Sequence, residues 1–190
     1  MQVESICLGQ LATNCYLVSV NGVTVLIDPA EPSEPLFSFI GKRKIDLVVN
    51  THGHFDHIGG NWALQTKGAQ VLIHQKDLQF VDRFYPDHQP IDRYLQEGEE
   101  IAGILRVLHV PGHSPGSVAL VGDGVLFSGD LLFAGSIGRT DLPGGSIKEM
   151  RRSLQRIRAL PGDYRVYPGH GGITTLEKER KTNPFILSLR

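Results

Sequence analysis

The stretch Asn50-Thr-His-Gly-His-Phe-Asp-His-Ile-Gly-Gly60 carries the strongest structural signal in this chain. It contains an H-x-H-x-D-H pattern made by His52, His54, Asp56 and His57, so three of the eight histidines fall within six residues. Imidazole and carboxylate groups are the usual protein ligands of zinc and other first-row divalent ions. The pattern follows an apolar run over residues 45–50, which predicts a strand, and it therefore predicts a metal site in the turn after that strand.

Three later segments repeat this local design, because each is an apolar run that ends in glycine and then a ligand-type side chain. They are Val107-Leu-His-Val-Pro-Gly-His113, Val125-Leu-Phe-Ser-Gly-Asp130 and Tyr164-Arg-Val-Tyr-Pro-Gly-His170. Glycine permits the tight turn and the close approach of neighbouring backbones. A lone Pro-Gly-His is usually only a loop, but beside the first motif each unit becomes a candidate ligand. There are more candidate ligands than one tetrahedral ion can bind, and their number suits two ions that share a carboxylate. The candidates are His52, His54, Asp56, His57, His113, Asp130 and His170.

Asp28 closes another predicted strand and precedes Pro29. We expect its carboxylate to accept a hydrogen bond from a metal-bound imidazole and so to fix the tautomer of that ring. The alternative is an aspartate that only forms the turn before the proline. His109 is expected within a strand, whereas His74 and His88 lack a motif and are expected at the surface or outside the ligand set.

Composition limits the classes of protein that this chain can represent. It has 190 residues, a net charge of −1 and no linker or low-complexity segment, which predicts one domain over residues 1–190. Near-neutral charge disfavours a nucleic-acid partner, and no apolar run approaches the ~20 residues of a membrane span. Glu4 stands where a signal peptide carries bases, so we expect a cytoplasmic protein. Cys7 and Cys15 lie on neighbouring predicted strands; a disulfide is geometrically conceivable, but buried thiols are favoured.

The order of predicted elements indicates two sheets between outer helices. Strands are predicted over residues 3–8, 14–20, 23–28, 45–50, 70–74, 105–110, 117–121, 125–128 and 165–167. Helices are predicted over residues 35–41, 58–68, 76–82, 146–159 and 174–182, with Ser146 as an N-cap. Asn21-Gly22 predicts a type I′ hairpin turn.

The order H-x-H-x-D-H, Pro-Gly-His113, Ser-Gly-Asp130 and Pro-Gly-His170 resembles the metallo-β-lactamase superfamily over essentially the whole chain. The resemblance implies an α/β fold of four layers, an αβ/βα sandwich with the metals at one edge between the two sheets. It also implies that His52, His54 and His113 hold one metal ion. Asp56, His57 and His170 would hold the second, with Asp130 bridging the two.

Two features place the chain within that superfamily. Class B β-lactamases commonly lack the bridging carboxylate that Asp130 supplies here, which disfavours antibiotic hydrolysis. Residues 135–145 resemble a loop of glyoxalase II and of persulfide dioxygenases, in which the residue matching Arg139 lies beside the substrate. The alternative for Arg139 is a structural pair with Asp141. Full glyoxalase II adds a C-terminal helical extension with basic groups for glutathione, whereas this sequence ends about twenty residues after His170.

The resemblance implies a hydrolase that attacks a thioester such as S-lactoylglutathione with a metal-bridging hydroxide, which Asp56 orients. Zinc is the favoured pair of ions, and the same ligands accept iron or manganese. One alternative is a persulfide dioxygenase with a single iron on His52, His113 and Asp130. Another is a metal-binding protein without activity. The expected partner is a small thioester, with no nucleic acid or membrane, and the sequence does not predict the oligomeric state.

Overall fold

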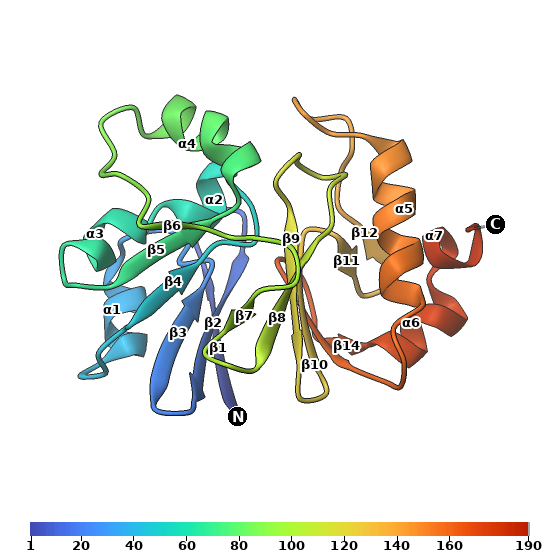
Figure 1. Cartoon of the computed structure of the whole chain (residues 1–190), viewed down its shortest axis with the longest axis horizontal. Helices are drawn as coiled ribbons and strands as arrows, with labels where there is room; N and C mark the ends of the chain where they lie inside the picture. Colours follow the sequence, from blue (N-terminus) through green and yellow to red (C-terminus); the bar gives the residue numbers. More distant parts are fainter. Residues whose placement is uncertain (190) are drawn as a thin grey trace.

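The computed structural model describes residues 1–189, and its framework is two six-stranded sheets (Figure 1). In the first sheet, the order follows the chain: β1 Gln2–Leu8, β2 Thr13–Val20, β3 Val23–Ile27, β4 Leu47–Val49, β5 Gln70–Ile73 and β6 Arg93–Tyr94. Strands β1 to β3 are antiparallel, and β3 to β6 are parallel. The parallel strands therefore end at one common edge.

The second sheet has the order β14-β13-β10-β9-β8-β7. Its strands are β7 Glu100–Ile101, β8 Leu105–His109, β9 Val118–Gly122, β10 Val125–Gly129, β13 Arg165–Pro168 and β14 Thr174–Thr175. Only the β10–β13 pair is parallel among the strands of this described sheet. A separate hairpin joins β11 Leu132–Phe133 to β12 Ser136–Ile137.

Helices cover the outer faces of both sheets (Figure 1). The helices that accompany the first sheet are α1 Glu34–Ile40, α2 Phe55–Ile58, α3 Asn61–Gln65, the 3₁₀ turn η1 Gln75–Asp77 and α4 Leu78–Phe84. Those that accompany the second sheet are α5 Ile147–Arg158, α6 Leu176–Thr182 and α7 Pro184–Leu187. The four-layer αβ/βα arrangement predicted from the sequence is confirmed.

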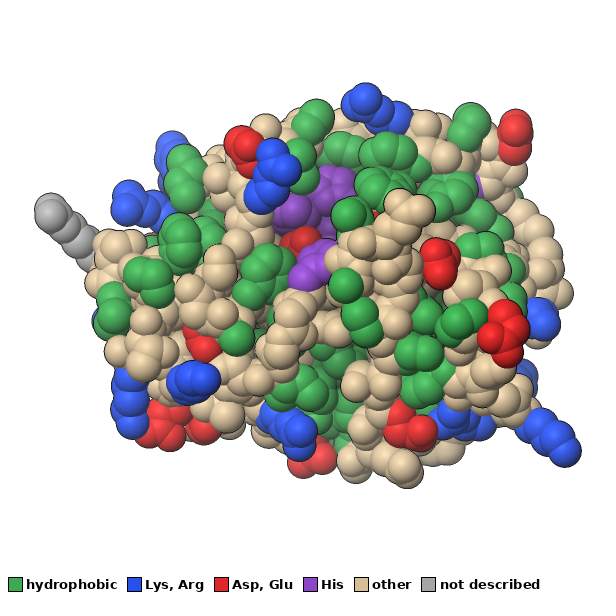
Figure 2. All heavy atoms as spheres, turned by 180° about the vertical axis from the view of Figure 1, so that it is seen from behind, with side chains coloured by type: hydrophobic (Ala, Val, Ile, Leu, Met, Phe, Trp, Pro, Cys, Tyr) green, Lys and Arg blue, Asp and Glu red, His purple; other side chains and the backbone are tan. Residues whose placement is uncertain are grey.

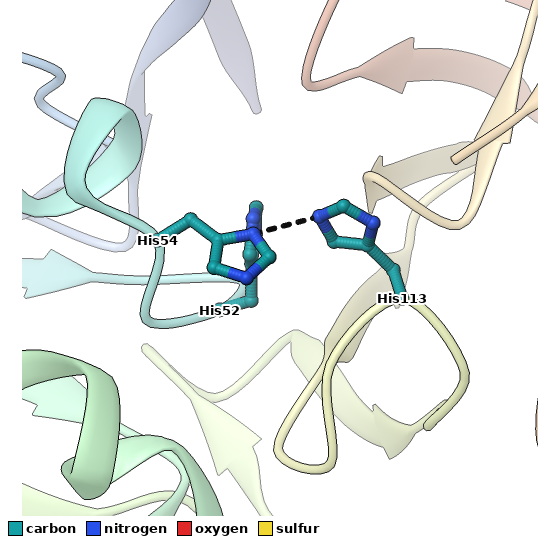
Figure 3. Close-up of side chains that lie close together, drawn as sticks. All are labelled: His52, His54 and His113. Atoms are coloured by element: carbon teal, nitrogen blue, oxygen red, sulfur yellow. Dashed lines mark hydrogen bonds between the residues drawn. The ribbon is translucent and has the colours of Figure 1, made fainter. Parts of the chain in front are cut away.

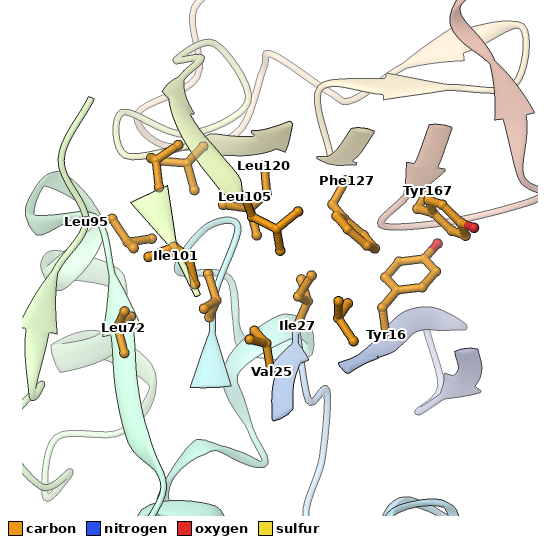
Figure 4. Packing of buried hydrophobic residues seen from close by; sticks show 14 of the residues in the cluster. Tyr16, Val25, Ile27, Leu72, Leu95, Ile101, Leu105, Leu120, Phe127 and Tyr167 are labelled. Carbon is orange, nitrogen blue, oxygen red and sulfur yellow. The ribbon is translucent and has the colours of Figure 1, made fainter. Parts of the chain in front are cut away.

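Three apolar cores separate the four layers. The central core lies between the sheets, where Tyr16 and Ile27 of the first meet Leu120 and Phe127 of the second (Figure 4). Strand alternation produces the outer core, because Cys15, Leu17 and Leu26 point from the opposite face towards α1 and α3. A further core joins the second sheet to α5, α6 and α7. Burial on both faces explains why residues 15–18 in the middle of β2 form an unbroken apolar run, Cys-Tyr-Leu-Val.

The hairpin between β2 and β3 confirms the turn prediction. Val20 pairs with Val23, and the two residues between them have positive φ values, 51° at Asn21 and 76° at Gly22. A type I′ turn requires this conformation at both central positions, and asparagine and glycine tolerate it best. The predicted N-cap is also present, since the Ser146 hydroxyl accepts a hydrogen bond from the backbone N–H of Glu149.

The helix predicted over residues 58–68 is wrong in its bounds. Helix α2 begins inside the metal motif at Phe55, and α3 begins after Gly59 and Gly60. A Cβ atom on either glycine would lie 2.3 Å or less from the backbone oxygen of Ala30 or Pro29. The two glycines therefore let the chain pack directly against that loop, and this contact interrupts the helix.

Two predictions near the ends of the sheets also need correction. The last predicted helix, 174–182, begins as strand β14, and a further helix, α7, follows it. Both cysteines are free thiols as favoured, but Cys7 is exposed rather than buried because β1 is an edge strand. Among residues 1–189, no helix has the length and apolar character that crossing a bilayer requires.

Candidate metal centre

The predicted ligand residues come together where strands of the two sheets end. Asp28 directly follows β3, Asp130 directly follows β10, and His170 comes two residues after β13. His52 follows β4 after a short turn, and His113 follows β8. Figure 2 shows histidine side chains at the bottom of a recess that hydrophobic side chains surround. The site therefore lies between the sheets and takes residues from both.

One group of potential ligands comprises His52, His54 and His113 (Figure 3). One nitrogen from each ring lies within 4.8 Å of the others. His54 Nδ1 and His113 Nε2 are only 2.9 Å apart, with their rings nearly perpendicular. Three imidazole nitrogens that converge in this way suit one cation.

A second group comprises Asp56, His57 and His170. His57 Nε2 lies 3.3 Å from His170 Nε2 and 3.4 Å from Asp56 Oδ2. His170 Nε2 is 3.3 Å from the same carboxylate oxygen. This second convergence of two imidazoles and a carboxylate is also a ligand set typical of a divalent ion.

Asp130 lies between the two groups. One of its carboxylate oxygens is 3.4 Å from His113 Nε2 and 3.5 Å from His170 Nε2, and the other is 3.6 Å from His57 Nε2. The carboxylate thus faces both groups, as a bridging ligand must. Its bridging role itself stays a prediction.

Four of the histidines are anchored through their other ring nitrogen, Nδ1. His57 Nδ1 lies 2.9 Å from Asp28 Oδ2, His113 Nδ1 is 2.8 Å from the Arg139 carbonyl oxygen, and His170 Nδ1 is 3.1 Å from the Leu11 carbonyl oxygen. His52 Nδ1 lies 3.2 Å from a threonine hydroxyl. When Nδ1 donates to such an acceptor, Nε2 keeps its lone pair for a metal ion and the ring orientation is fixed.

Asp28 connects this anchoring to the backbone. Its carboxylate accepts hydrogen bonds from the backbone N–H and the hydroxyl of Thr51, at 2.8 and 2.7 Å, in addition to the contact with His57. Asp28 is buried and has a φ of 52°, which aspartate tolerates better than most residues. The contact expected from the sequence is present, and its effect on metal binding stays a prediction.

Burial and neighbouring charges shift the pKa values of the clustered groups. Burial and then His113 lower the pKa of His54 to about 4. Burial also lowers the pKa of His57, but Asp28 and Asp130 outweigh it and raise that pKa to about 9. Burial raises the pKa of Asp56, but the hydrogen bonds with His170 and Thr13 and the charge of His57 together outweigh it, so the pKa lies well below its usual range. The cluster therefore contains carboxylate charge that a bound cation would neutralise.

Two further observations show that the residues present fit metal ions. His52 Nε2 and Asp130 Oδ1 are buried polar atoms without a hydrogen-bond partner in the described chain. Such atoms are costly unless something binds them. In addition, a Cβ atom on Gly169 would lie 2.2 Å from Asp130 Oδ1, so glycine lets the backbone pass directly behind the carboxylate.

Two residues that support the candidate ligands were not predicted from the sequence. The Thr13 hydroxyl donates to Asp56 Oδ2 at 3.0 Å. Asp77, which is fully buried, accepts hydrogen bonds from Gly53 N at 2.8 Å, Ser114 Oγ at 2.6 Å and Gly116 N at 2.5 Å. Asp77 therefore holds the loop between two ligands to the loop after His113. Neither residue belongs to a local pattern, so only the fold reveals them.

Arg139 lines the recess, but its guanidinium group is engaged by Asp141. Nε and one terminal nitrogen donate to the two carboxylate oxygens at 3.0 and 2.9 Å. The pair between Arg139 and Asp141, which was the alternative to a contact with substrate, is thus present. Contact with a substrate stays a prediction, while the backbone carbonyl of Arg139 already anchors His113.

A cavity of about 560 Å³ opens above the ligands. Its floor contains His54, Asp56, His113, Asp130 and His170. Apolar side chains from both halves form its walls, among them Phe80 and Phe84 from α4, Phe133 from β11, and Leu142 and Pro143 from the loop before α5. A small molecule that enters the cavity would therefore meet the candidate ligands at its base.

Comparison with known proteins identifies the relatives of this chain. The model of the Metallo-beta-lactamase superfamily matches residues 8–170. The hydroxyacylglutathione hydrolase GloC of Haemophilus influenzae is 33% identical over 216 residues, covering 99% of each chain.

Two solved structures are also similar. One is TTHA1623, crystallised in a di-iron-bound form, with 40% identity and a TM-score of 0.87; the match covers 96% of this chain and 99% of that one. The other is ETHE1 from Myxococcus xanthus, with 26% identity and a TM-score of 0.80; the match covers 97% of this chain and 84% of that one. The similarity in each case extends over nearly the whole chain.

Proposed function

The chain belongs to the metallo-beta-lactamase superfamily, and from that premise we propose that it is a two-metal hydrolase of thioesters of the S-lactoylglutathione type. The observation that carries the proposal is the convergence of seven imidazole and carboxylate side chains into two adjoining groups at the base of one cavity. The similarity to a hydroxyacylglutathione hydrolase supports the choice of substrate. The di-iron form of TTHA1623 supports two ions, and we propose zinc, with iron or manganese as the alternatives.

Two divalent cations held there would lower the pKa of a shared water towards neutrality and polarise the carbonyl of the substrate. The protein side chains position the reacting groups. Asp56 keeps its carboxylate orientation through the hydroxyl of Thr13, and we expect it to orient the attacking water. A substrate that fills the cavity between its apolar walls would displace bulk water from the reacting groups.

Thiol release from S-D-lactoylglutathione tests this proposal, with protein of measured metal content. We expect turnover that a chelator abolishes and that two equivalents of zinc, iron or manganese restore. Asp56→Ala should lose at least about a hundredfold in kcat, the order of one electrostatic or proton-handling group. Fully loaded protein without turnover would exclude this substrate, and activity unchanged in Asp56→Ala would favour a binding protein without catalysis.

A persulfide dioxygenase with one iron is the second candidate. The resemblance of residues 135–145 to a loop of persulfide dioxygenases and the 3.4 Å contact between His113 and Asp130 favour it, because His52, His113 and Asp130 could form a two-histidine, one-carboxylate iron site. One iron per chain together with oxygen uptake on a persulfide substrate would establish this function. Two ions per chain without oxygen uptake would exclude it.

A further inference from the structure

Large apolar side chains form most of the wall of the cavity. Of the eight large apolar side chains exposed in residues 1–189, Leu11, Phe55 and Phe84 all line this one cavity. Phe55 and Phe84 lie edge to face, with their ring centroids 5.5 Å apart. Exposed apolar side chains that gather in one place mark a binding surface.

The apolar wall continues on the opposite side of the cavity. Phe133, Ile137 and Leu142 contribute there from the second half of the chain, and Phe80 packs against the ring of His54 at 5.1 Å. A lactoyl group carries a methyl and a hydroxyl and would leave most of this wall without a contact. An extended or aromatic acyl chain would bury it, and each buried methylene favours binding about fourfold.

The rim of the cavity carries one cation with no acidic partner. Arg83 is exposed, lies 5.9 Å from the centre of the Phe84 ring and forms no ion pair within residues 1–189. Arg139, on the other side, is already paired with Asp141. The only acidic groups on the cavity floor are Asp56 and Asp130, which belong to the candidate metal centre. Arg83 is therefore positioned to receive an anionic group of an incoming molecule.

We infer that the substrate is a thioester with an apolar acyl group and an anionic thiol carrier. The acyl chain lies against Phe55 and Phe84, and a carboxylate of the carrier meets Arg83. This inference rests on the proposed thioester hydrolysis and names its substrate class. Such a substrate would use both the apolar walls of the cavity and the unpaired guanidinium group at its rim.

Binding of S-alkylglutathiones tests the inference separately from catalysis, because a thioether cannot be hydrolysed. S-methyl-, S-butyl- and S-hexylglutathione are titrated into metal-loaded protein by calorimetry. Because the wall is half-open, each added methylene should raise the binding affinity about twofold. S-hexylglutathione should therefore bind about 30-fold more tightly than S-methylglutathione. A ratio below threefold would overturn the inference.

Variants locate the two parts of the ligand. Phe84→Ala, and the double variant with Phe55→Ala, should reduce the methyl-to-hexyl ratio at least threefold, whereas Ile173→Ala, an exposed apolar residue elsewhere, should leave it unchanged. Arg83→Gln should weaken all three compounds about threefold and reduce their salt dependence, with Arg151→Gln as control. The inference would be contradicted if the double variant kept the wild-type ratio of hexyl to methyl affinity, or if Arg83→Gln bound the three compounds as tightly as the wild type.

Turnover of S-lactoylglutathione and S-hexanoylglutathione then separates the two levels of the proposal. A higher kcat/KM for the hexanoyl compound supports both. If the lactoyl compound is cleaved but the affinity for the S-alkylglutathiones does not rise with chain length, the apolar acyl group is excluded and thioester hydrolysis remains supported. A steep thioether series without cleavage of either thioester overturns the hydrolysis and leaves the apolar cavity standing.

Discussion

Replacing Asp77 by alanine should destabilise the folded protein strongly, although this residue touches no candidate metal ligand directly. Its carboxylate accepts hydrogen bonds from Gly53 N, Ser114 Oγ and Gly116 N. In the alanine variant Ser114 keeps the contact with Ser117 Oγ at 2.7 Å, but both backbone N–H groups lose their acceptor. Two buried backbone donors without an acceptor therefore remain.

The magnitude follows from those two donors. Each unsatisfied buried N–H costs about 1–3 kcal/mol, so the pair costs about 2–6 kcal/mol. Burial raises the pKa of the Asp77 carboxyl despite its three donors, so removing the carboxylate also recovers some desolvation energy. A net loss of about 3 kcal/mol should lower the Tm by about 6–12 °C for a chain of this size.

Asp77→Asn provides an intermediate case. One carboxylate oxygen accepts from Gly116 N and the other from Gly53 N, so an amide nitrogen at either position leaves one of these donors without an acceptor. We therefore expect a loss of about 1–3 kcal/mol, smaller than for alanine. Asp82→Ala is the matched control, because this aspartate lies in α4, the helix that follows Asp77 directly, but is exposed and should change stability by about 0.5 kcal/mol or less.

Thermal unfolding followed by circular dichroism measures all three variants, with the metal content determined on each sample. We expect the Tm to decrease in the order wild type, asparagine variant, alanine variant. An alanine variant that melts within about 2 °C of the wild type, a shift of less than about 1 kcal/mol, would refute this role of Asp77.

Three other variants or measurements test the site and the fold. Asp28→Asn keeps a residue suited to the positive φ but can replace the carboxylate oxygen beside His57 Nδ1 by an amide donor. Zinc affinity in a competitive titration should therefore fall about 10- to 100-fold, and unchanged affinity would contradict the anchoring role. Gly169→Ala should lose most of its metal in elemental analysis because the new Cβ meets a candidate ligand, whereas Gly172→Ala, with open space around it, should retain it; equal metal contents would be inconsistent with that contact. Burial and the nearby negative charge of Asp28 raise the pKa of the Cys15 thiol. A disulfide reagent at pH 8 should therefore modify only Cys7 in the native protein and both cysteines after denaturation. Rapid modification of both cysteines in the native protein would contradict the burial of Cys15.

The layers and the clustering of the candidate ligands could be predicted because each rests on a local pattern. Strand β2 is apolar on both faces, Asn21-Gly22 has one preferred turn, and the strand–Gly–ligand units are contiguous in sequence. The interruption between α2 and α3 could not be predicted, because it arises where Gly60 packs on a loop about thirty residues earlier. Short pairs such as β6 and β14 also depend on their neighbours and not on their own residues.

The supporting residues escaped prediction for the same physical reason. Asp77 receives its hydrogen bonds from loops 24 and 37 to 39 positions away, and Thr13 reaches Asp56 across 43 positions. Arg83 resembles any other surface arginine until the fold places it at the rim of the cavity. Local sequence patterns therefore locate the candidate metal ligands. The residues that support those ligands or line the cavity rim are defined by contacts with distant parts of the chain.

The origin of the ligands in both sheets has a consequence for the life of the protein in a cell. An ion that binds the folded state alone stabilises it by about 4 kcal/mol at a concentration a thousandfold above its Kd. Here that stabilisation would act between the two halves of the molecule, because His54 and His113 belong to different halves. A chain made under metal starvation would open more often and be degraded faster. The amount of this protein would then follow the metal supply without any dedicated regulator.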